Sequence, residues 1–545
     1  MTGILYVLGL LVVAMALLML SYRYLHMLQL ETYEVKFYLK WVHKNKKRSI
    51  RPLLFVFLAA VAGQIVLAAV PATRDYSFWL GMAVLILAVI AAFVKMKREP
   101  VKKDLVVTAR VRRLMTALLI FLWAGCLLSY LLGGAAGDLL GGTVYAFAAP
   151  VLVSLWVLLL PYMVALAAWF MQPFEKMVKR KFFRQAERRL ASFENMIKIG
   201  ITGSFGKTST KFILGTILAE RYDVKVTPHS YNTPMGVAKV IREELTGREE
   251  IFVAEMGAKG VGEIKEMCDL VHPRYGLLTS VGRQHMDTFG TLENIQATKY
   301  ELIEALPADG VGFFPADSEP CLSLYDKTEH VEKVLFGFDG AGRKLDVTAR
   351  DVTVGPFGSR FTLVMGEEEI SCETRILGRH NIGNILGCAA VAGKLGLTLE
   401  EIARGIAKIE PVEHRLQMLP TNNGLTVIDD AFNASPSGVR AAMDVISGFP
   451  GRKIVITPGL IEQGPEEDAE NEKFGRLMAH AADYAILVGP SHTRPIAEGL
   501  LKEGFPEDHI IVVSSLDEAT ARLSGITRAG DCVLFENDLP DLYNE

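Results

Sequence analysis

The sequence lacks the cysteine patterns that mark disulfide-rich or zinc-binding proteins. Its 545 residues include six cysteines, which are scattered along the chain and form no C-x-x-C pair. This usage predicts neither a disulfide framework nor a zinc site, and it is typical of proteins from a reducing compartment. We expect the six thiols to serve as small, buried apolar groups.

The sequence also lacks a strong excess of charge of either sign. Its 58 lysine and arginine residues nearly balance its 61 aspartate and glutamate residues, which leaves a net charge of −3. A balance of this kind gives no general attraction for a polyanion, and we therefore expect no nucleic-acid partner. There is no low-complexity segment and no internal repeat, and the length allows about three domains.

Long apolar runs, by contrast, fill the first third of the chain. The mean hydropathy of +0.27 is high for a soluble protein, and the apolar excess lies before residue 171. Five runs reach or approach the ~20 residues that a helix needs to cross the ~30 Å hydrocarbon core of a bilayer. The first run is not a cleavable signal peptide, because "MTGI" carries no basic residue and no small-residue cleavage site follows. We predict an α-helical transmembrane bundle over residues 1–172, with spans at about 2–21, 53–71, 77–94, 114–132 and 143–170.

Basic residues alternate between the loops that join these runs. The loops after the first and third runs are rich in lysine and arginine, whereas the loop after the second contains only Arg74 and the loop after the fourth contains none. The positive-inside rule then predicts a plasma-membrane protein with its N-terminus outside and everything after the fifth span in the cytoplasm. Residues 173–196 are also basic and are expected to form a linker helix. The cations either serve this topology or bind anionic lipid headgroups. No charged residue inside the runs indicates a transport path.

From about residue 198 the pattern changes to the alternating strand and helix segments of α/β domains. Short apolar runs such as "MIKIGITG", "EIFVAEMG" and "YGLLTSVG" predict buried strands. Residues 345–375 lack helical periodicity and predict a small β-meander, and a second α/β set follows from "LTVIDDAFN" onward. We place the boundary near residue 410, which gives a central domain at 197–410 and a C-terminal domain at 411–545.

The segment "TGSFGKTST" lies between a predicted strand and a predicted helix. It does not fit the common P-loop spacing G-x-x-x-x-G-K-[ST], because Ile201 stands at the place of the first glycine. The shorter form still suits phosphate, since Gly203 and Gly206 let backbone N–H groups approach phosphate oxygens and a helix N-terminus adds positive potential. Lys207 would neutralise phosphate charge, and the Thr208 hydroxyl can bind Mg²⁺.

Three further polar residues carry weak signals when each is taken alone. Glu255 ends the apolar run "IFVAE", where a carboxylate would be wanted near a loop-bound Mg²⁺. His285 follows the run "YGLLTSVG", and Lys299 lies on an amphipathic helical stretch. A strand-end acid is commonly structural, a single histidine commonly has no catalytic role, and a lysine on such a helix is commonly solvated.

Taken together, these residues belong to a longer series of motifs. The run "VAEMGAKGVGEIKEMCDLVHPRYGLLTSVGRQHMDTFGTLENIQATKYELIEAL" is joined in order by "LGRHNIGNILGCAAVAGKLGLTLEEIA", "PVEHRLQ" and "VIDDAFNASPSGVRAAMDVI", and "SYNTPMG" precedes it. The series resembles the Mur ligase family, and within that family the UDP-MurNAc-tripeptide D-alanyl-D-alanine ligase branch. The short phosphate loop belongs to the resemblance, which covers residues from about 197 to 500.

The resemblance implies a central ATPase domain and a dinucleotide-fold C-terminal domain that closes over ATP. It also implies two Mg²⁺ ions, one held by Thr208 and Glu255 and a second held with the help of His285. Lys299 matches the family's carbamylated lysine, which acts as a carboxylate-like metal partner. Lys207, His285 and Lys299 are then the expected catalytic residues. The expected nucleotide-binding residues are Gly203, Ser204, Gly206, Lys207, Thr208, Ser209, Asn381, Asn384, Arg415 and Asp430.

The reaction that the resemblance implies begins when a substrate carboxylate attacks the γ-phosphate of ATP, which gives an acyl phosphate and ADP. An amine then displaces phosphate and forms an amide. Metal ions and basic groups offset charge on the transferring phosphoryl group, and domain closure excludes the water that would hydrolyse the acyl phosphate.

The sequence departs from the family pattern at both substrate ends. The five apolar runs stand where the family has a UDP-sugar-binding domain, and Phe432 and Ser435 replace a tyrosine and an asparagine. The stretches "ITPGLIEQG" and "CVLFENDLPDLYNE" differ from the motifs that help receive the amine. Asn232 and Asn433 remain candidates for substrate binding.

We hypothesise a membrane-anchored, ATP-dependent amide ligase of peptidoglycan or cell-envelope precursor synthesis. Its carboxyl substrate would be an envelope precursor presented at the membrane on a polyprenyl carrier, and its amine an amino acid or a dipeptide of the D-Ala-D-Ala type. One alternative is a membrane-bound amino-acid polymerase or glutamate ligase. Another is a non-catalytic, ATP-binding scaffold for envelope enzymes, although a scaffold has no need of Lys207, Glu255, His285 and Lys299 together.

Overall fold

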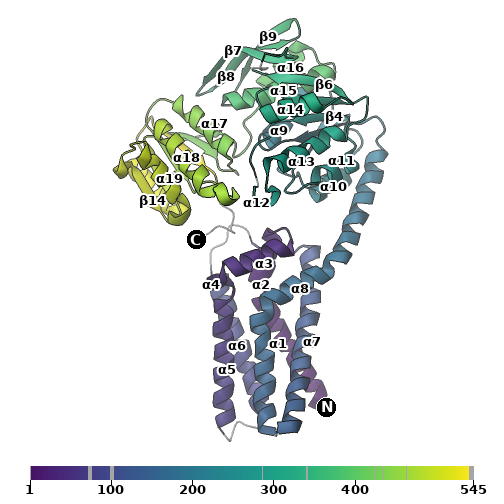
Figure 1. Cartoon of the computed structure of the whole chain (residues 1–545), viewed down its shortest axis with the longest axis vertical. Helices are drawn as coiled ribbons and strands as arrows, with labels where there is room; N and C mark the ends of the chain where they lie inside the picture. Colours follow the sequence, from purple (N-terminus) through teal and green to yellow (C-terminus); the bar gives the residue numbers. More distant parts are fainter. Residues whose placement is uncertain are drawn as a thin grey trace. The chain divides into compact units, whose positions relative to one another are not determined.

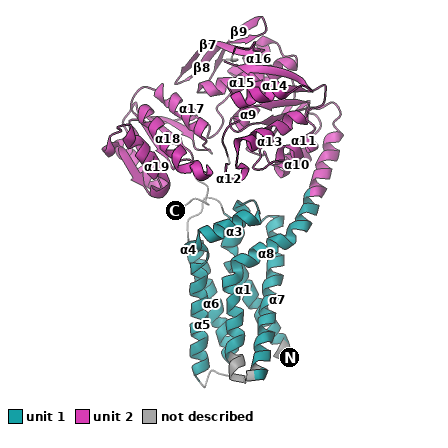
Figure 2. Ribbon diagram, in the orientation of Figure 1, with its two compact units in different colours: residues 1–179, 540–544 teal, residues 180–539, 545 magenta. Residues whose placement is uncertain are grey.

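The computed structural model describes residues 2–70, 76–98, 104–140, 142–284, 286–338, 342–422, 424–432, 434–461 and 463–538. These residues form two compact units, which we call unit 1 (through Lys179) and unit 2 (from Arg180 onward) (Figure 2). Two of the predicted site residues, His285 and Asn433, lie outside the described residues.

Unit 1 is a bundle of long apolar helices (Figure 1). Four described helices are long and apolar enough to cross a membrane, and α1 and α2, which meet at a bend of 43°, make a fifth candidate if the pair is one span. The predicted helical bundle is thus confirmed. Its helices are α1 (Thr2–Leu20), α2 (Tyr22–Leu30), α3 (Val35–Lys44), α4 (Lys46–Ser49), α5 (Arg51–Ala69), α6 (Ser77–Lys97), α7 (Ala109–Leu140) and α8 (Gly142–Ala191).

Small residues allow α7 and α8 to approach each other closely. A Cβ atom on Gly133 would lie 2.6 Å from Cα of Ala149, and one on Gly125 would lie 2.4 Å from the Trp156 ring. The Trp156 indole N–H donates to the hydroxyl of Ser129 at 2.9 Å. Close backbone contact and a satisfied polar group are the interactions that hold apolar helices together where the hydrophobic effect cannot.

The expected fifth span and the expected basic linker form one helix in the structure. α8 extends through both and contains Pro150, Pro161 and Pro173. The change of polarity near residue 172 does not end the helix, because lysine, arginine, glutamine and glutamate are all good helix formers.

The first sheet of unit 2 has nine strands in the order β2-β3-β1-β4-β5-β6-β7-β8-β9. The strands from β2 to β7 are parallel to their neighbours, whereas β7, β8 and β9 form an antiparallel extension that confirms the predicted meander. The strands are β1 (Ile197–Thr202), β2 (Val224–Val226), β3 (Ile251–Glu255), β4 (Tyr275–Leu278), β5 (Val311–Pro315), β6 (Glu332–Gly337), β7 (Val347–Gly355), β8 (Gly358–Met365) and β9 (Glu368–Thr374).

Helices cover both faces of this sheet, so side chains of one strand alternate between two cores. Ile251 and Val253 join one core, and Phe252 and Ala254 join the other. The first core is closed by α9 (Lys207–Leu218), α15 (Arg379–Lys394) and α16 (Leu399–Ala407). The second is closed by α10 (Pro234–Glu243), α11 (Glu263–Val271), α13 (Leu292–Glu304) and α14 (Glu319–Lys327).

The second sheet has six strands in the order β10-β11-β15-β12-β13-β14. β10 pairs antiparallel with β11, and the other neighbouring pairs are parallel. The helices α17 (Pro436–Ser447), α18 (Glu467–Ala481) and α19 (Pro490–Lys502) pack on one face and α20 (Leu516–Ile526) on the other. The strands are β10 (Gln417–Leu419), β11 (Thr426–Asp430), β12 (Lys453–Thr457), β13 (Tyr484–Val488), β14 (Ile510–Val513) and β15 (Cys532–Glu536). The predicted pair of α/β domains is confirmed.

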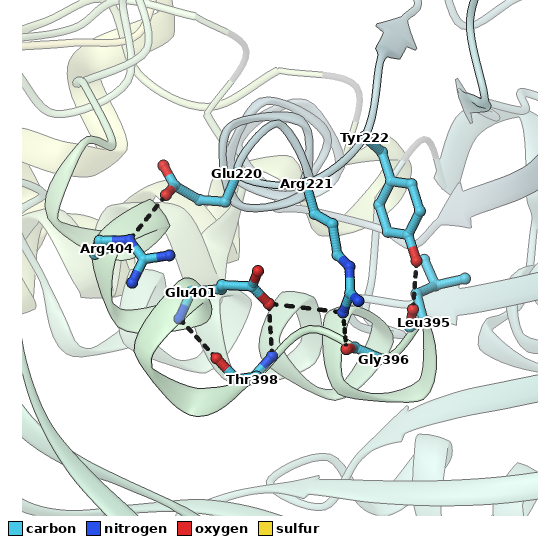
Figure 3. A network of polar contacts seen from close by, with 8 residues as sticks. All are labelled: Glu220, Arg221, Tyr222, Leu395, Gly396, Thr398, Glu401 and Arg404. Atoms are coloured by element: carbon cyan, nitrogen blue, oxygen red, sulfur yellow. Dashed lines mark hydrogen bonds and ion pairs between the residues drawn. The ribbon is translucent and has the colours of Figure 1, made fainter.

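Polar contacts join the end of α9 to α16 and to the turn before it (Figure 3). The Glu220 carboxylate, whose side chain is 8% exposed, accepts from Arg404 at 3.2 Å and from Lys408 at 2.6 Å. The Tyr222 hydroxyl donates to the carbonyl of Leu395 at 2.6 Å. These contacts fix the end of α9, the helix that follows the phosphate loop, against α16.

All six cysteines are buried and none forms a disulfide, as expected from their scattered positions.

Candidate functional site

The loop between β1 and α9 makes two close backbone approaches that require glycine. Gly206 has a φ of +81°, and a Cβ atom there would lie 2.9 Å from Oδ1 of Asn384. At Gly203, a Cβ atom would lie 2.0 Å from Oγ1 of Thr279. α9 begins at Lys207, directly after this turn. The loop therefore delivers backbone N–H groups to a helix N-terminus, the arrangement that binds phosphate.

Polar groups that follow β4 hold this loop in shape. The Ser204 hydroxyl donates to the carbonyl of Gly282 at 2.8 Å and accepts from its N–H at 3.0 Å. The N–H of Ser204 donates to the carbonyl of Ser280, and the N–H of Phe205 donates to the Ser280 hydroxyl. Ser204, one of the predicted nucleotide-binding residues, is thus engaged in shaping the loop through both its hydroxyl and its N–H.

Lys207 folds back over the loop. Its ammonium donates to the carbonyls of Gly203 at 2.6 Å and Ser204 at 3.1 Å. Burial lowers the pKa of Lys207 to about 8, against the opposing effect of Glu255 and with a further lowering by Arg415. The half-buried lysine therefore lies where an anion would be bound, and a bound phosphate would offer it better partners than two neutral carbonyls. Ser209 lies in the same first turn of α9 and is half-buried.

Glu255 is fully buried at the end of β3, beside the phosphate loop. Its Oε1 atom accepts from the Thr208 hydroxyl at 3.0 Å and from the Asn232 amide at 2.9 Å. Because β1 and β3 are neighbouring parallel strands, their carboxyl ends bring the loop and this carboxylate together. Asn232, which the sequence suggested as a substrate-binding residue, donates its amide hydrogen bond to Glu255 in the structure.

Lys211 completes this cluster and was missed in the sequence. Its side chain is 0% exposed, and its ammonium lies 3.0 Å from Oε2 of Glu255 and also donates to the carbonyl of His229. A signal for its burial exists, because Lys211 falls on the same face of α9 as Leu214 and Leu218, at i, i+3 and i+7. A lysine on a core-facing stripe requires a buried anion, and Glu255 is that anion.

Lys299 is 3% exposed on α13. Burial lowers its pKa to about 7, with a further lowering by the Lys207 ammonium that Glu263 and Glu301 oppose. Within the part of the chain that the structure describes, no group forms a hydrogen bond or salt bridge with its ammonium, and the Phe289 ring centroid lies 5.8 Å away. Lys299 therefore lies close enough to Lys207 for the two ammonium groups to repel each other.

The predicted adenine residues lie at the start of α15. The Asn381 amide donates to the carbonyl of Leu377 at 2.9 Å, and the Asn384 amide donates to Oδ1 of Asn381 at 3.2 Å. The Asn384 side chain also packs against Gly206. The two asparagines therefore lie next to the phosphate loop. Burial lowers the pKa of the neighbouring His380 to about 4, so its imidazole is neutral near pH 7.

Arg415 comes from the segment that links the two sheets of unit 2. Its neighbours His414 and Leu416 have φ values of +58° and +44°, a strained backbone that surrounding contacts must impose. Its guanidinium donates to the carbonyl of Phe432 at 3.0 Å and lies over the Phe432 ring at 4.4 Å. Burial lowers the pKa of Arg415, against the opposing charges of Asp430, Glu255 and Glu536. The influence of Glu255 shows that Arg415 lies within electrostatic range of the phosphate loop.

Asp430 and Glu536 are opposite each other at the ends of the parallel strands β11 and β15. Burial raises the pKa of Asp430 to about 6, while Arg415 opposes that shift. Burial and the Asp430 carboxylate raise the pKa of Glu536 well above its ordinary value. Glu536 is 1% exposed, and no described group donates a hydrogen bond to its Oε2 atom. The two acids share this buried space most favourably when they hold a proton between them.

The donors around Glu255 suit magnesium better than a softer metal. The described residues contain no group of three or more histidine, cysteine, aspartate or glutamate side chains that could hold a metal ion alone. Thr208 and Glu255 instead present one hydroxyl and one carboxylate beside a phosphate loop. Mg²⁺ is bound in this way, by one or two protein oxygens together with waters and substrate phosphates.

The site combines a glycine-rich phosphate loop with a buried carboxylate beside it, and the second α/β sheet supplies an arginine. This combination is that of an ATP-dependent ligase. Residues 201–392 match the Mur ligase middle domain, and residues 414–536 match the Mur ligase, glutamate ligase domain. The chain belongs to the Mur ligase family and is an ADP-forming, ATP-dependent amide ligase. Both matches begin after residue 200, so neither includes unit 1.

Within this family, the chain is similar to UDP-N-acetylmuramoyl-tripeptide–D-alanyl-D-alanine ligases. It is 31% identical over 359 residues to the enzyme of Mycobacterium tuberculosis H37Rv, covering 62% of this chain and 69% of the relative. It is 29% identical over 345 residues to that of Bacillus subtilis 168, covering 62% and 72%. The structure of MurF from Acinetobacter baumannii has a TM-score of 0.60 at 25% identity, over 66% of this chain and 77% of that one. MurF from Thermotoga maritima in complex with ADP gives 0.59 at 25% identity, over 66% and 80%.

Proposed function

We propose that the protein is a membrane-anchored ligase that activates a carboxylate of a cell-envelope precursor with ATP and joins it to the amine of an amino acid or dipeptide. The observation that carries this proposal is the cluster at Glu255. Thr208 and Asn232 fix one carboxylate oxygen, and Lys207 begins the adjacent helix over the phosphate loop. This is the arrangement needed to bind a nucleotide phosphate and a divalent cation together.

We assign the nucleotide phosphates to the loop Gly203–Thr208, with Ser209 in the first turn of α9. Asn381 and Asn384 would contact adenine, as the family resemblance implies, and Asn384 lies against Gly206 at the end of the loop. Arg415 would reach the phosphates, and Asp430 the ribose. Support for Arg415 comes from the strained backbone of its neighbours His414 and Leu416 and from its position within electrostatic range of Glu255 and Lys207.

We assign one Mg²⁺ to Thr208 and Glu255, and a second to a site that includes His285 and Lys299 as its carbamate. Support for the carbamate comes from burial, which lowers the pKa of Lys299 to about 7 and so makes the neutral amine abundant. In forming the carbamate, the amine nitrogen bonds to the carbon of CO₂ and releases a proton, which converts a buried cation into an anion. The metal ions would neutralise charge on the phosphoryl oxygens and orient them.

In the first step of the proposed reaction, a carboxylate oxygen of the substrate bonds to the γ-phosphorus and the bond to ADP breaks. Lys207 and Arg415 hold the phosphate oxygens and offset the charge that develops on them. In the second step, the amine nitrogen bonds to the acyl carbon, phosphate leaves with the bridging oxygen, and the amine loses a proton. The two sheets of unit 2 would close around the acyl phosphate and exclude water.

We further propose that unit 1 anchors the enzyme in the plasma membrane, with unit 2 in the cytoplasm, and that the carboxyl substrate is presented there on a polyprenyl carrier. Support comes from the apolar helices of unit 1 and from the family match, which begins only after residue 200. The named relatives are UDP-MurNAc-tripeptide ligases, so a UDP-linked muropeptide is the reference substrate. Deleting unit 1 should impair ligation of the membrane-presented substrate much more than ligation of the UDP-linked one; equal rates for the deleted and full-length protein on both would contradict this.

Amine-dependent release of ADP tests the reaction itself. The full-length protein with ATP, Mg²⁺ and a muropeptide should release ADP only when a suitable amine is added, and Lys207→Ala should abolish the release. Testing D-Ala-D-Ala against single amino acids separates addition of a dipeptide from the alternative of a glutamate ligase or polymerase. That alternative is consistent with the match of residues 414–536 to a glutamate ligase domain. ATP binding without amine-dependent turnover would instead indicate a scaffold.

A bicarbonate experiment tests the carbamate. Protein prepared with ¹³C-bicarbonate should show a carbamate carbonyl signal by NMR that is absent from a Lys299→Gln variant. A signal that persists in the variant would contradict the assignment to Lys299.

A further inference from the structure

A row of lysines lies on the outer face of α3 and α4 in unit 1. Tyr38, Trp41 and Val42 turn inward and are buried in the bundle. The exposed cations on the other side are Lys36, Lys40, Lys44, Lys46 and Lys47. Among the described residues, none of these five ammonium groups forms a salt bridge with a carboxylate. Like charges four residues apart on a helix repel each other, so this face, which we call the lysine face, carries charge that the described protein does not neutralise.

The Glu175 carboxylate of unit 1 is paired with arginines. The Glu175 carboxylate accepts two hydrogen bonds from the Arg113 guanidinium, both at 2.8 Å, and lies 3.8 Å from Arg110. Arg110 also lies over the ring of Tyr33 at 3.9 Å and within electrostatic range of Glu34. Arg110 and Arg113 are therefore paired with a carboxylate inside unit 1, whereas the five lysines are not.

The segment that presents the lysine face is held rigidly. Thr32 and Tyr33, in the turn before α3, have φ values of +53° and +65°, and consecutive non-glycine residues of this kind persist only where contacts impose them. The contacts come from Gln29, whose amide donates to the Tyr33 hydroxyl at 3.1 Å and to the carbonyl of Val106 at 2.9 Å. The N–H of Val106 donates back to the Gln29 side chain at 3.0 Å. A basic loop that served topology alone would need no such construction.

The lysine face lies at the end of the apolar spans, where lipid headgroups lie. The candidate span that contains α5 runs from Lys46 to Ala69, so Lys46 and Lys47 lie in its first turn. The Tyr38 hydroxyl donates to the carbonyl of Pro161 inside the span of α8 at 3.0 Å, and the Tyr24 hydroxyl donates to the carbonyl of Ser49 at 2.5 Å. Figure 1 shows α3 lying across the end of the bundle opposite the N-terminus. At the end of a membrane span the available anions are lipid phosphates.

We propose that the lysine face binds the diphosphate headgroup of a polyprenyl-linked carboxyl substrate. The inference rests on the proposed function and identifies the chemical group, the diphosphate, that unit 1 would bind on that substrate. Successive lysines at 36, 40 and 44 are about 6 Å apart along the helix axis, a spacing that lets two ammonium groups contact one diphosphate. A fixed scaffold favours a defined headgroup over bulk phospholipid, which a flexible basic segment attracts equally well.

Native mass spectrometry of the full-length protein in neutral detergent tests the proposal with farnesyl diphosphate as the probe. The wild type should retain the lipid at concentrations where Lys36→Gln/Lys40→Gln/Lys44→Gln retains on the order of a hundredfold less, since three cations contribute about tenfold or less each. Lys95→Gln/Lys97→Gln, in the last turn of α6, is the matched control and should retain the lipid like the wild type. Tryptophan fluorescence checks the fold of unit 1, which contains all five tryptophans.

Three results would overturn the proposal: equal retention of phosphatidylglycerol, an equal loss in the control variant, or binding of inorganic pyrophosphate as tight as that of the lipid. Amine-dependent ADP release with a soluble UDP-linked muropeptide separates this inference from the proposed function. The triple variant should release ADP at the wild-type rate. Lipid retention without any ligation would contradict the function alone, and ligation without lipid retention would contradict the lysine face alone.

Discussion

The ammonium of Lys211 lies 3.0 Å from Oε2 of Glu255, and both side chains are fully buried. Neither charge meets solvent, so each depends on the other for compensation. The remaining oxygen, Oε1, is held by Thr208 and Asn232. These contacts fix the position of the Glu255 carboxylate at the end of β3. The protein itself therefore orients this charged group of the site.

Lys211→Met should destabilise unit 2 strongly, because it leaves the Glu255 carboxylate buried without its cation. Breaking a buried pair from one side typically costs about 3–5 kcal/mol. Urea unfolding followed by tyrosine fluorescence would measure this. The double variant Lys211→Met/Glu255→Gln should recover part of the loss, and a double variant as unstable as the sum of the two single variants would contradict the pairing.

The ion pairs of Glu220 differ from the buried Lys211–Glu255 pair because their cations are exposed to solvent. Its partners Arg404 and Lys408 are 57% and 65% exposed, so water solvates them when the carboxylate is removed. Glu220→Gln should therefore cost no more than about 1 kcal/mol. A loss as large as that of Lys211→Met, measured by the same urea unfolding, would mean that the network in Figure 3 contributes more than its exposure indicates.

The buried acids Asp430 and Glu536 should make unit 2 less stable as the pH rises. Folding raises the pKa of Asp430 from 3.8 to about 6, so the folded state binds more protons across that window and the unfolding free energy falls with rising pH. Glu536→Gln removes the like charge and should flatten this decline. Unfolding curves at several pH values between about 4 and 7 would test it, and an unchanged slope in the variant would contradict the coupling.

His380 should act in the opposite direction over nearly the same range. Folding lowers its pKa from 6.5 to about 4, so the unfolded state binds the extra proton and stability rises with pH across this window. The contribution is at most about 3 kcal/mol. In His380→Gln the rise should disappear, so the variant's own unfolding profile should show the decline caused by the acids, and the difference between the two profiles should give the contribution of His380. A His380→Gln profile parallel to the wild type would show that the imidazole titrates normally.

Arg415 is expected to act on the transferring phosphoryl group. Arg415→Ala should lower kcat for ADP release by about 10²–10³-fold, the usual effect of removing one stabilising group from a developing charge, with a smaller change in KM. Arg415→Lys keeps the charge and should retain part of the activity. If both variants raise KM and leave kcat unchanged, Arg415 contributes to binding alone.

The sequence predicted well those elements whose own residues determine them. Apolar runs such as "EIFVAEMG" and "YGLLTSVG" predicted β3 and β4, because a buried parallel strand is apolar on both faces. The three-residue strands β2 and β10 were missed, since pairing with β3 and β11 defines them and their own pattern does not. In the site, Gly203, Lys207 and Thr208 lie close together in the chain and were predicted together. Glu536, 106 positions after Asp430, meets it only through the register of β11 and β15.

The burial of the six cysteines has a practical consequence for the proposed membrane orientation. Burial raises the pKa of Cys268 to about 12 and that of Cys321 to about 11, so native thiols outside unit 1 are both shielded and protonated and react slowly with maleimides. A single cysteine introduced on the surface would then be the main site of labelling without removal of any native thiol. Reagents that cannot cross a bilayer, applied to intact cells with such a cysteine at Lys473 or near the start of α1, would show directly which end of the protein faces outward.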